Sequence, residues 1–183
     1  MIQRKKIVPF ASGKVLEIGV GSGLNLPFYK LDRVESLIAM DPSVEMLIRA
    51  EKSLDPQMPP TQFVRGFAQE IPVQSNSIDT IVMTYTLCSI PDVESSLAEF
   101  KRVLKPGGQL LFCEHGLAPD AKVQKWQKRL NPLWAKLGGG CLLDKNIPEL
   151  IRKHSFTINR MESMYIPGFK PASYNYWGVA TPS

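Results

Sequence analysis

The segment that most constrains the fold is a short apolar run that ends in three closely spaced glycines. It covers residues 15–23, and the glycines stand at every second position as Gly19, Gly21 and Gly23. An apolar run of this length is typical of a strand buried in a parallel sheet. Glycines in such a turn indicate a backbone with positive φ, or a backbone that a ligand approaches closely. The alternative is a glycine turn that binds nothing.

An acidic residue, Glu17, stands two positions before the first glycine. The dinucleotide-binding fingerprint has the spacing G-x-G-x-x-G and places a pyrophosphate at the start of a helix. The spacing here is G-x-G-x-G, and a carboxylate at the mouth of the turn would repel a phosphate. We therefore expect a ligand that carries an amine or another cationic group.

A second acidic residue follows the next apolar segment. Residues 36–40 predict the second strand, which ends in Asp41 and Pro42. A carboxylate at this strand end, roughly 20 residues after the glycine turn, can accept hydrogen bonds from both hydroxyls of a ribose. The alternative is that Asp41 only caps the helix predicted over residues 43–53, a role that Ser43 can also fill.

Together these motifs resemble the class I S-adenosylmethionine-dependent methyltransferases. The resemblance rests on the sequences E-I-G-V-G-S-G, S-I-D-T-I and R-V-L-K-P-G-G at residues 17–23, 77–81 and 102–108. It implies a single α/β domain over residues 1–183, a Rossmann-like three-layer sandwich with a seven-stranded, mostly parallel sheet whose last strand is antiparallel. The third motif predicts a helix that its glycines stop. The family usually has helices before the first strand, for which residues 1–13 leave little room.

The resemblance also implies the cofactor and its contacts. S-adenosylmethionine carries an amine, a sulfonium and a ribose but no phosphate, which agrees with the charge of the glycine turn. The residues that the resemblance assigns to it are Glu17, Gly19, Gly21, Gly23, Asp41, Pro42, Ala68, Gln69, Thr84 and Leu87. Ala68 and Gln69 would lie against the adenine, and Thr84 and Leu87 near the methionine part. The alternative for Ala68 and Gln69 is an ordinary loop.

One histidine is a candidate for the chemistry. His115 follows the strand predicted over residues 109–113, whose end points into the same cleft. Histidine titrates near neutral pH, so His115 is a candidate general base or substrate contact. The alternative is a histidine that bonds the backbone. Methyl transfer from a sulfonium needs no nucleophile on the enzyme, so we interpret Cys88 as a small packed residue.

Residues 119–145 predict a helical insertion. Apolar residues recur at helical spacing between Val123 and Leu137, and lysines lie on the other faces. Pro132 predicts a break into two helices near Asn131. The insertion has three interpretations: a lid over the substrate pocket, a basic amphipathic element in weak peripheral contact with an anionic membrane, or a helix that covers the sheet.

The composition limits which binding partners and which cellular compartment we expect. The net charge is +5, but no long basic run is interleaved with aromatic residues, so we expect no nucleic-acid partner. The chain has three cysteines and no C-x-x-C motif. This count argues against a disulfide framework and a zinc site, and favours the reducing cytoplasm. We expect no metal cofactor.

The methyl acceptor is less constrained than the cofactor. Residues 87–91, 114–115, 130–134 and 139–141 look most like the small-molecule group that contains the alkyl-thiol S-methyltransferases. The leading hypothesis is therefore a methyltransferase for a small molecule, with a thiol or another soft nucleophile as acceptor. The alternatives are a lipid acceptor at a membrane surface, either a quinone ring carbon or a phospholipid amine, and a non-catalytic binding module of the same fold. The intact Glu17, glycines and Asp41 argue against the binding module.

Overall fold

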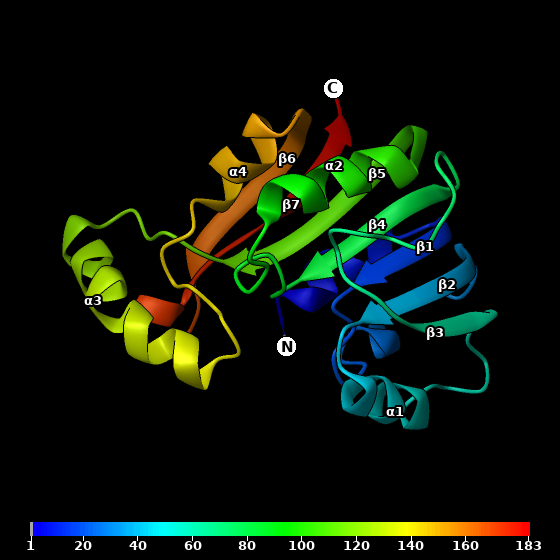
Figure 1. The fold of residues 1–183 in the computed structure, drawn as a ribbon, viewed down its shortest axis with the longest axis horizontal. Coiled ribbons are helices and arrows are strands. Elements are labelled where there is room, and N and C mark those ends of the chain that lie inside the picture. Colours follow the sequence, from blue (N-terminus) through cyan, green and yellow to red (C-terminus); the bar gives the residue numbers. More distant parts are fainter. Residues whose placement is uncertain (1) are drawn as a thin grey trace.

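The computed structural model describes residues 2–183, which form one seven-stranded sheet (Figure 1). The strand order is β3-β2-β1-β4-β5-β7-β6. The strands are β1 (Gly13–Ile18), β2 (Val34–Asp41), β3 (Thr61–Arg65), β4 (Ile78–Thr84), β5 (Leu104–His115), β6 (Phe156–Tyr165) and β7 (Tyr174–Pro182). The pairs among β1 to β5 are parallel, whereas β7 is antiparallel to both β5 and β6. The predicted seven-stranded sheet with a reversed last strand is confirmed.

The glycine turn lies at the point where the strand order changes direction. The chain leaves β1 toward β2 on one side, and β4 pairs with β1 on the other side. Ligands of open parallel sheets bind in the crevice outside the carboxyl ends of the strands at such a point. The carboxyl end of β1 is therefore the expected place for a small-molecule site.

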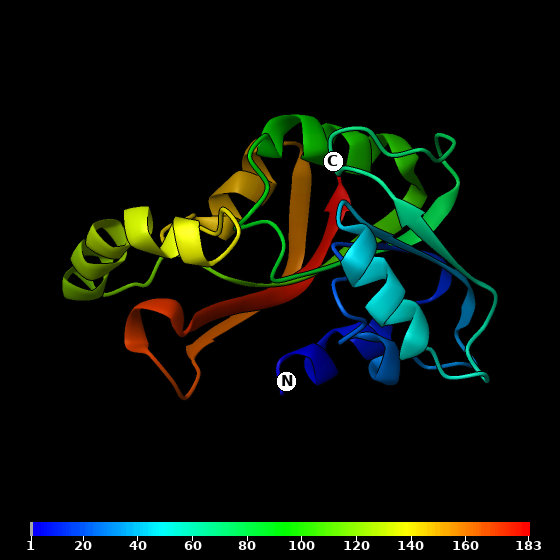
Figure 2. The same ribbon diagram turned by 60° about the horizontal axis from the view of Figure 1, so that its bottom comes forward.

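Helices cover both faces of the sheet, which gives the predicted three layers (Figure 2). On one face, α2 (Val93–Val103) and α4 (Ile147–Lys153) bury Leu97, Phe100 and Ile151 against the strands. On the other face, α1 (Val44–Lys52) contributes Leu47 and Ala50 to a second core cluster. The N-terminal segment, with 3-10 turns at Arg4–Lys6 and Val8–Phe10, adds Ile7 and Val8 to this cluster. An apolar core cluster lies on each side of β1, which explains why Val15, Leu16 and Ile18 are all buried although they point to alternate faces.

The helix ends within the third motif, as predicted, but the glycines of the motif do not stop it. Helix α2 ends at Val103, and β5 begins at the next residue, Leu104, so the glycines lie within the strand. Gly107 has a φ of +80°, and a Cβ on Gly108 would lie 2.9 Å from the carbonyl oxygen of Lys105. The glycines serve a tight change of direction inside β5 and not a helix terminus.

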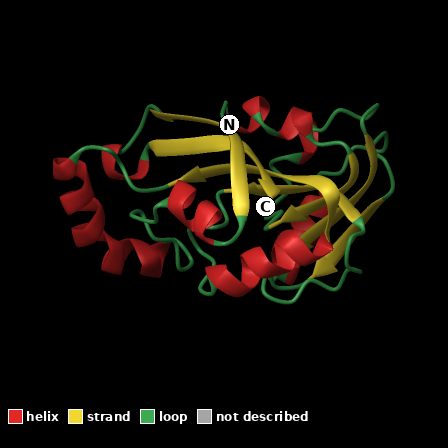
Figure 3. Ribbon diagram, turned by 90° about the horizontal axis from the view of Figure 1, so that it is seen from above, coloured by secondary structure: helices red, strands yellow, loops and turns green. Residues whose placement is uncertain are grey.

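Helix α3 (Ala121–Leu137) is continuous, so the predicted break at Pro132 is wrong. Proline removes one hydrogen bond from a helix, but Pro132 is exposed, where water can solvate the freed carbonyl. Its neighbour Asn131 accepts a hydrogen bond from Leu143 N at 2.8 Å and donates one to Asp144 at 2.6 Å. Figure 3 shows α3 at one end of the sheet. Within residues 2–183, no helix combines the length and the apolar character needed to cross a bilayer.

Candidate cofactor site

A cavity of about 590 Å³ lies at the carboxyl edge of the sheet, where the fold predicts a ligand. Its wall comes from the ends of β1 and β2, the loops after β3 and β4, and Gly139 beyond α3. A volume of this size is typical of small-molecule sites. The wall contains Gly19, Gly21, Asp41, Pro42, Ala68 and Gln69. The structure therefore brings six of the ten predicted cofactor residues together around one cavity.

The three glycines of the turn have three different surroundings. All have positive φ, at +70° for Gly19, +55° for Gly21 and +83° for Gly23. A Cβ on Gly19 would meet the Thr86 side chain at 2.5 Å, and one on Gly23 would meet Ser53 of the α1 region at 2.5 Å. A Cβ on Gly21 would meet nothing within 4 Å. Gly21 is therefore the glycine that leaves a cradle open toward the cavity, whereas Gly23 serves packing.

Asp41 binds the glycine turn and still has hydrogen-bond acceptors available for a ligand. Its Oδ2 accepts a hydrogen bond from Gly21 N at 2.9 Å, and its Oδ1 accepts one from Ser43 N at 2.9 Å. The side chain of Ser43, and not that of Asp41, caps α1 by accepting from Met46 N. A carboxylate offers about four acceptor positions. Asp41 therefore has acceptors left for two hydroxyl groups.

Glu17 lies beneath the turn and not at its mouth. It is 1% exposed, and its two oxygens accept hydrogen bonds from Asn25 at 2.8 Å and Tyr29 at 2.6 Å. Burial raises the pKa of Glu17 to about 7. The structure places Thr84 in the same buried group, where its hydroxyl contacts Asn25 and the guanidinium of Arg4. Glu17 and Thr84 form a layer that supports the turn.

The loop after β4 supplies wall residues that the sequence analysis did not single out. Tyr85 has a φ of +56°, which is rare for a residue with a side chain and clusters at functional sites. Its hydroxyl donates to Asn175 at 2.6 Å, and Thr86 N donates to the carboxylate of Glu114 at 2.8 Å. Leu87 is fully buried in the core and does not line the cavity. The position directly after a buried strand was the available signal for Tyr85 and Thr86.

His115 lies behind this wall with two cysteines. Its Nε2 is 3.0 Å from Cys141 Sγ, and its ring stacks on Tyr85 with centroids 6.4 Å apart. Burial lowers the pKa of His115, but the hydrogen bond to Cys141 and the negative charges of Cys141 and Glu114 together outweigh burial, so the net pKa is raised. Hydrogen bonds from Cys88 and His115 lower the pKa of Cys141. The structure thus separates His115 from the cavity by one side chain, Tyr85.

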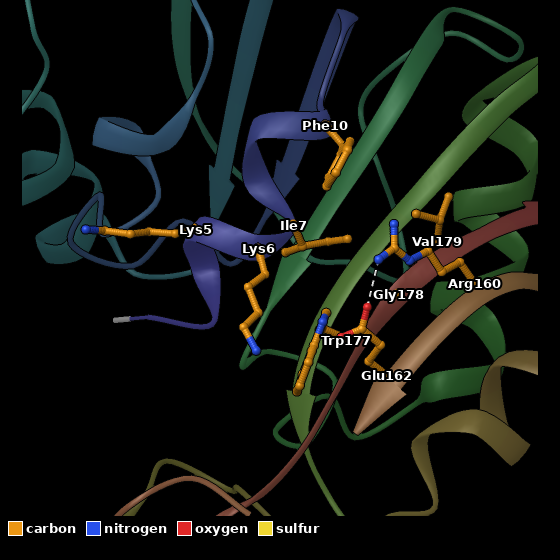
Figure 4. A pocket seen from close by; sticks show the side chains of 9 residues that line it. All are labelled: Lys5, Lys6, Ile7, Phe10, Arg160, Glu162, Trp177, Gly178 and Val179. Carbon is orange, nitrogen blue, oxygen red and sulfur yellow. Dashed lines mark hydrogen bonds and ion pairs between the residues drawn. The ribbon is translucent and has the colours of Figure 1, made fainter. Parts of the chain in front are cut away.

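A second cavity of about 370 Å³ lies elsewhere, between the N-terminal turns and the β6–β7 edge (Figure 4). Arg160 and Glu162 form an ion pair at 2.8 Å in its wall, and Lys6 Nζ lies 4.0 Å from the ring centroid of Trp177. None of the predicted site residues lines it. The motifs converge on the larger cavity alone.

The methyltransferase domain family matches residues 16–112 of the chain, which contain the glycine turn, Asp41 and the loop after β4. The chain is 31% identical over 160 residues to thiol S-methyltransferase TMT1A of Homo sapiens, covering 85% of this chain and 66% of that protein. It is 30% identical over 150 residues to thiol S-methyltransferase TMT1B of Rattus norvegicus, covering 81% and 62%. The matched region is thus less than two thirds of the length of these relatives.

The fold is similar to that of a solved S-adenosylmethionine-dependent methyltransferase from Methanosarcina mazei. The TM-score is 0.74 at 20% identity, over 91% of each chain. The chain belongs to the class I S-adenosylmethionine-dependent methyltransferases, and S-adenosylmethionine is the cofactor of this family. The residues present fit that molecule, because the cradle at Gly21 is open and Asp41 has acceptors for ribose hydroxyls.

Proposed function

We propose that the protein transfers a methyl group from S-adenosylmethionine to a small thiol. The cofactor assignment rests on the open space beside Gly21 in the cavity wall. The backbone N–H of Gly21 donates a hydrogen bond to Asp41, which also lines the cavity. In this proposal Asp41 accepts the ribose hydroxyls, and Pro42, Ala68 and Gln69 enclose the adenine. Glu17, Gly23, Thr84 and Leu87 act from behind the wall, by holding the turn and the loop after β4 in place.

The bound cofactor supplies a methyl group on a sulfonium, which is reactive toward soft nucleophiles. The chain's own residues have to orient an acceptor and exclude water from it. The part of the cavity wall that the loop after β4 and Gly139 supply carries no charged side chain, and we assign the acceptor to this part. The similarity to thiol S-methyltransferases and this uncharged wall both favour a thiol over an ammonium acceptor. We propose that His115, which lies behind Tyr85, promotes the loss of the acceptor's proton.

Residues 119–145 are proposed to form the lid within one domain of residues 1–183. Helix α3 is tied to the rest of the chain by Gln127, which is buried and donates to the carbonyl oxygens of Gly116 and Pro171 at 2.9 Å. Gly139, at the end of this insertion, reaches the cavity wall. Three free, buried cysteines fit a reducing compartment such as the cytoplasm.

Calorimetric titration of S-adenosylmethionine tests the cofactor site. Asp41→Ala is expected to weaken binding by about tenfold or more, because a lost hydrogen bond to a charged group costs ~1.5–3 kcal/mol. Asp32→Ala removes an exposed carboxylate outside the cavity and is the matched control. Equal affinities for Asp41→Ala and the wild-type protein would contradict the assignment.

Transfer of labelled methyl groups tests the acceptor. The protein is incubated with labelled cofactor and, in separate reactions, an alkyl thiol, an alkyl amine and vesicles that contain phosphatidylethanolamine. We expect label in the thiol. Label in the amine or the lipid, with none in the thiol, would refute the thiol proposal and leave the cofactor site intact.

A further inference from the structure

Two cysteines and a histidine form a compact cluster directly behind the cavity wall. One ligand atom each from Cys88, His115 and Cys141 lies within 4.8 Å of the other two. Cys88 is 2% exposed and Cys141 is 8% exposed. A methyl transfer of the kind proposed above needs no pair of thiols. We propose that the three residues bind one Zn²⁺ ion whose fourth coordination position is open to the acceptor.

The donor set suits zinc in type, spacing and charge. Thiolate sulfur and imidazole nitrogen are the common protein ligands of Zn²⁺, and its sites are tetrahedral. The usual bond lengths place tetrahedral sulfur and nitrogen ligands roughly 3.5–3.8 Å apart. His115 Nε2 and Cys141 Sγ, now 3.0 Å apart, would separate by about 0.6 Å to admit the ion. Two thiolates and one neutral imidazole balance the charge of Zn²⁺, so the buried group is neutral.

Hydrogen bonds between three loops hold the ligands in place. Leu142 N donates to the carbonyl oxygen of Cys88 at 3.1 Å, which joins the loops of the two cysteines. Lys145 Nζ donates to the carbonyl oxygens of Leu87 and Ile90 at 2.9 and 2.7 Å, on either side of Cys88. His115 is the last residue of β5. Because these hydrogen bonds already fix the segments that carry the ligands, little conformational entropy is lost when the ion binds.

Unpaired polar atoms surround the cluster. Among residues 2–183, the buried His115 Nδ1 and Trp134 Nε1 have no hydrogen-bond partner. Trp134 Nε1 and the Cβ of Cys141 both lie within 3.5 Å of the position that a Cβ on Gly138 would take. The indole N–H is therefore beside Cys141, where it can support a metal-bound thiolate from the outer shell. Buried polar atoms without partners are rare, and a metal-bound thiolate at Cys141 would give the indole N–H of Trp134 an acceptor.

The open fourth coordination position of the ion would explain how the acceptor thiol is activated, and this activation step rests on the proposed function. Ser89, next to Cys88, and Gly139, two residues before Cys141, both line the cofactor cavity. A thiol that binds the ion gives its proton to solvent, because metal coordination deprotonates thiols. Its sulfur then forms a bond to the methyl carbon, and the bond from that carbon to the cofactor's sulfur breaks with the electron pair on that sulfur. His115 is in this scheme a metal ligand, and the ion replaces the general base.

Titration of the reduced, metal-free protein with Co²⁺ tests the site, because cobalt reports thiolate ligands by its charge-transfer bands. We expect one equivalent to bind, with visible bands of a tetrahedral ion, and Zn²⁺ to displace it. Cys141→Ser and His115→Ala are expected to weaken binding by about tenfold or more. Cys113→Ala, which removes the buried cysteine outside the cluster, is the control and is expected to leave the bands unchanged. Circular dichroism confirms that each variant is folded.

Several results would overturn the inference. Absence of charge-transfer bands in the reduced, folded protein would refute the metal site, as would full binding by Cys141→Ser. Ethanethiol is expected to shift the bands of the cobalt protein, and an unchanged spectrum would refute the open position. Equal methyl transfer by the metal-free and zinc-loaded protein would refute the activating role. No transfer to any thiol, with the cobalt site intact, would instead refute the proposed acceptor.

Discussion

The buried carboxyl group of Glu17 makes stability depend on pH in a direction that can be stated in advance. Burial raises its pKa from 4.5 to about 7 in the folded protein. The folded state therefore holds a proton that the unfolded chain releases once the pH exceeds 4.5. The free energy of unfolding falls as the pH rises through this window, and the loss is complete above the folded-state pKa. A shift of this size corresponds to about 3 kcal/mol.

Glu17→Gln removes the titration and keeps a side-chain oxygen that can accept from Tyr29. We expect the free energy of unfolding of the variant, relative to that of the wild-type protein, to rise by about 3 kcal/mol between about pH 4 and 8. Urea denaturation followed by circular dichroism at several pH values measures this difference. Other titrating groups, such as the buried Glu114, are present in both proteins and cancel. Glu51→Gln, on the exposed side of α1, is the control. A difference that stays constant with pH would show that Glu17 takes up no proton on folding.

Three further predictions follow from the surroundings of single residues. Gly21→Ala and Gly107→Ala both place a Cβ at a residue with positive φ and with no atom within 4 Å of that Cβ. Each substitution is expected to lower the free energy of unfolding by about 1 kcal/mol. Only Gly21→Ala is expected to weaken S-adenosylmethionine binding in calorimetry. Arg4→Ala removes the guanidinium that bonds Asn25 and Thr84 and is expected to lower cofactor affinity and the melting temperature, whereas Lys5→Ala changes neither. On α3, Leu133 is 61% exposed beside Arg129 and Lys136, so the interpretation of α3 as a membrane-contacting helix predicts that Leu133→Ser reduces sedimentation with anionic vesicles. No sedimentation of the wild-type protein would contradict that interpretation.

The sheet was predictable because its strands differ in sequence from everything around them. The central residues of β1 and β4 are mostly apolar and buried, because helices or turns cover both faces of the sheet. β1 is followed by Gly19, and β4 ends at Thr84. The reversed last strand was predictable because only a short 3-10 turn at Lys170–Ala172, and no α-helix, separates β6 from β7. The errors concern boundaries that depend on tertiary contacts. β5 begins five residues before the predicted Gln109, because Leu104 pairs with Ile78 of β4.

The cofactor residues were predictable as a set, but their positions within the site were not. Strand ends and positive-φ glycines leave a local signal, so Gly21 and Asp41 were placed at the cavity correctly. Whether a carboxylate at a strand end faces a ligand or the protein depends on neighbours far along the chain. For Glu17 these are Asn25 and Tyr29, whose side chains donate hydrogen bonds to its two carboxylate oxygens.

The cysteine–histidine cluster could not be predicted from the spacing of its residues along the chain. Zinc motifs are recognised when ligands stand a few residues apart, and no such pair exists among Cys88, His115 and Cys141. Cys88 instead follows β4 and His115 is the last residue of β5. Cys141 follows α3, and its loop is joined to that of Cys88 by the hydrogen bond from Leu142 N. Parallel strands bring their carboxyl ends to one edge, so residues that follow separate strands meet there whatever their separation in sequence. The same geometry that gathers the cofactor residues therefore gathers these ligands behind the same cavity wall.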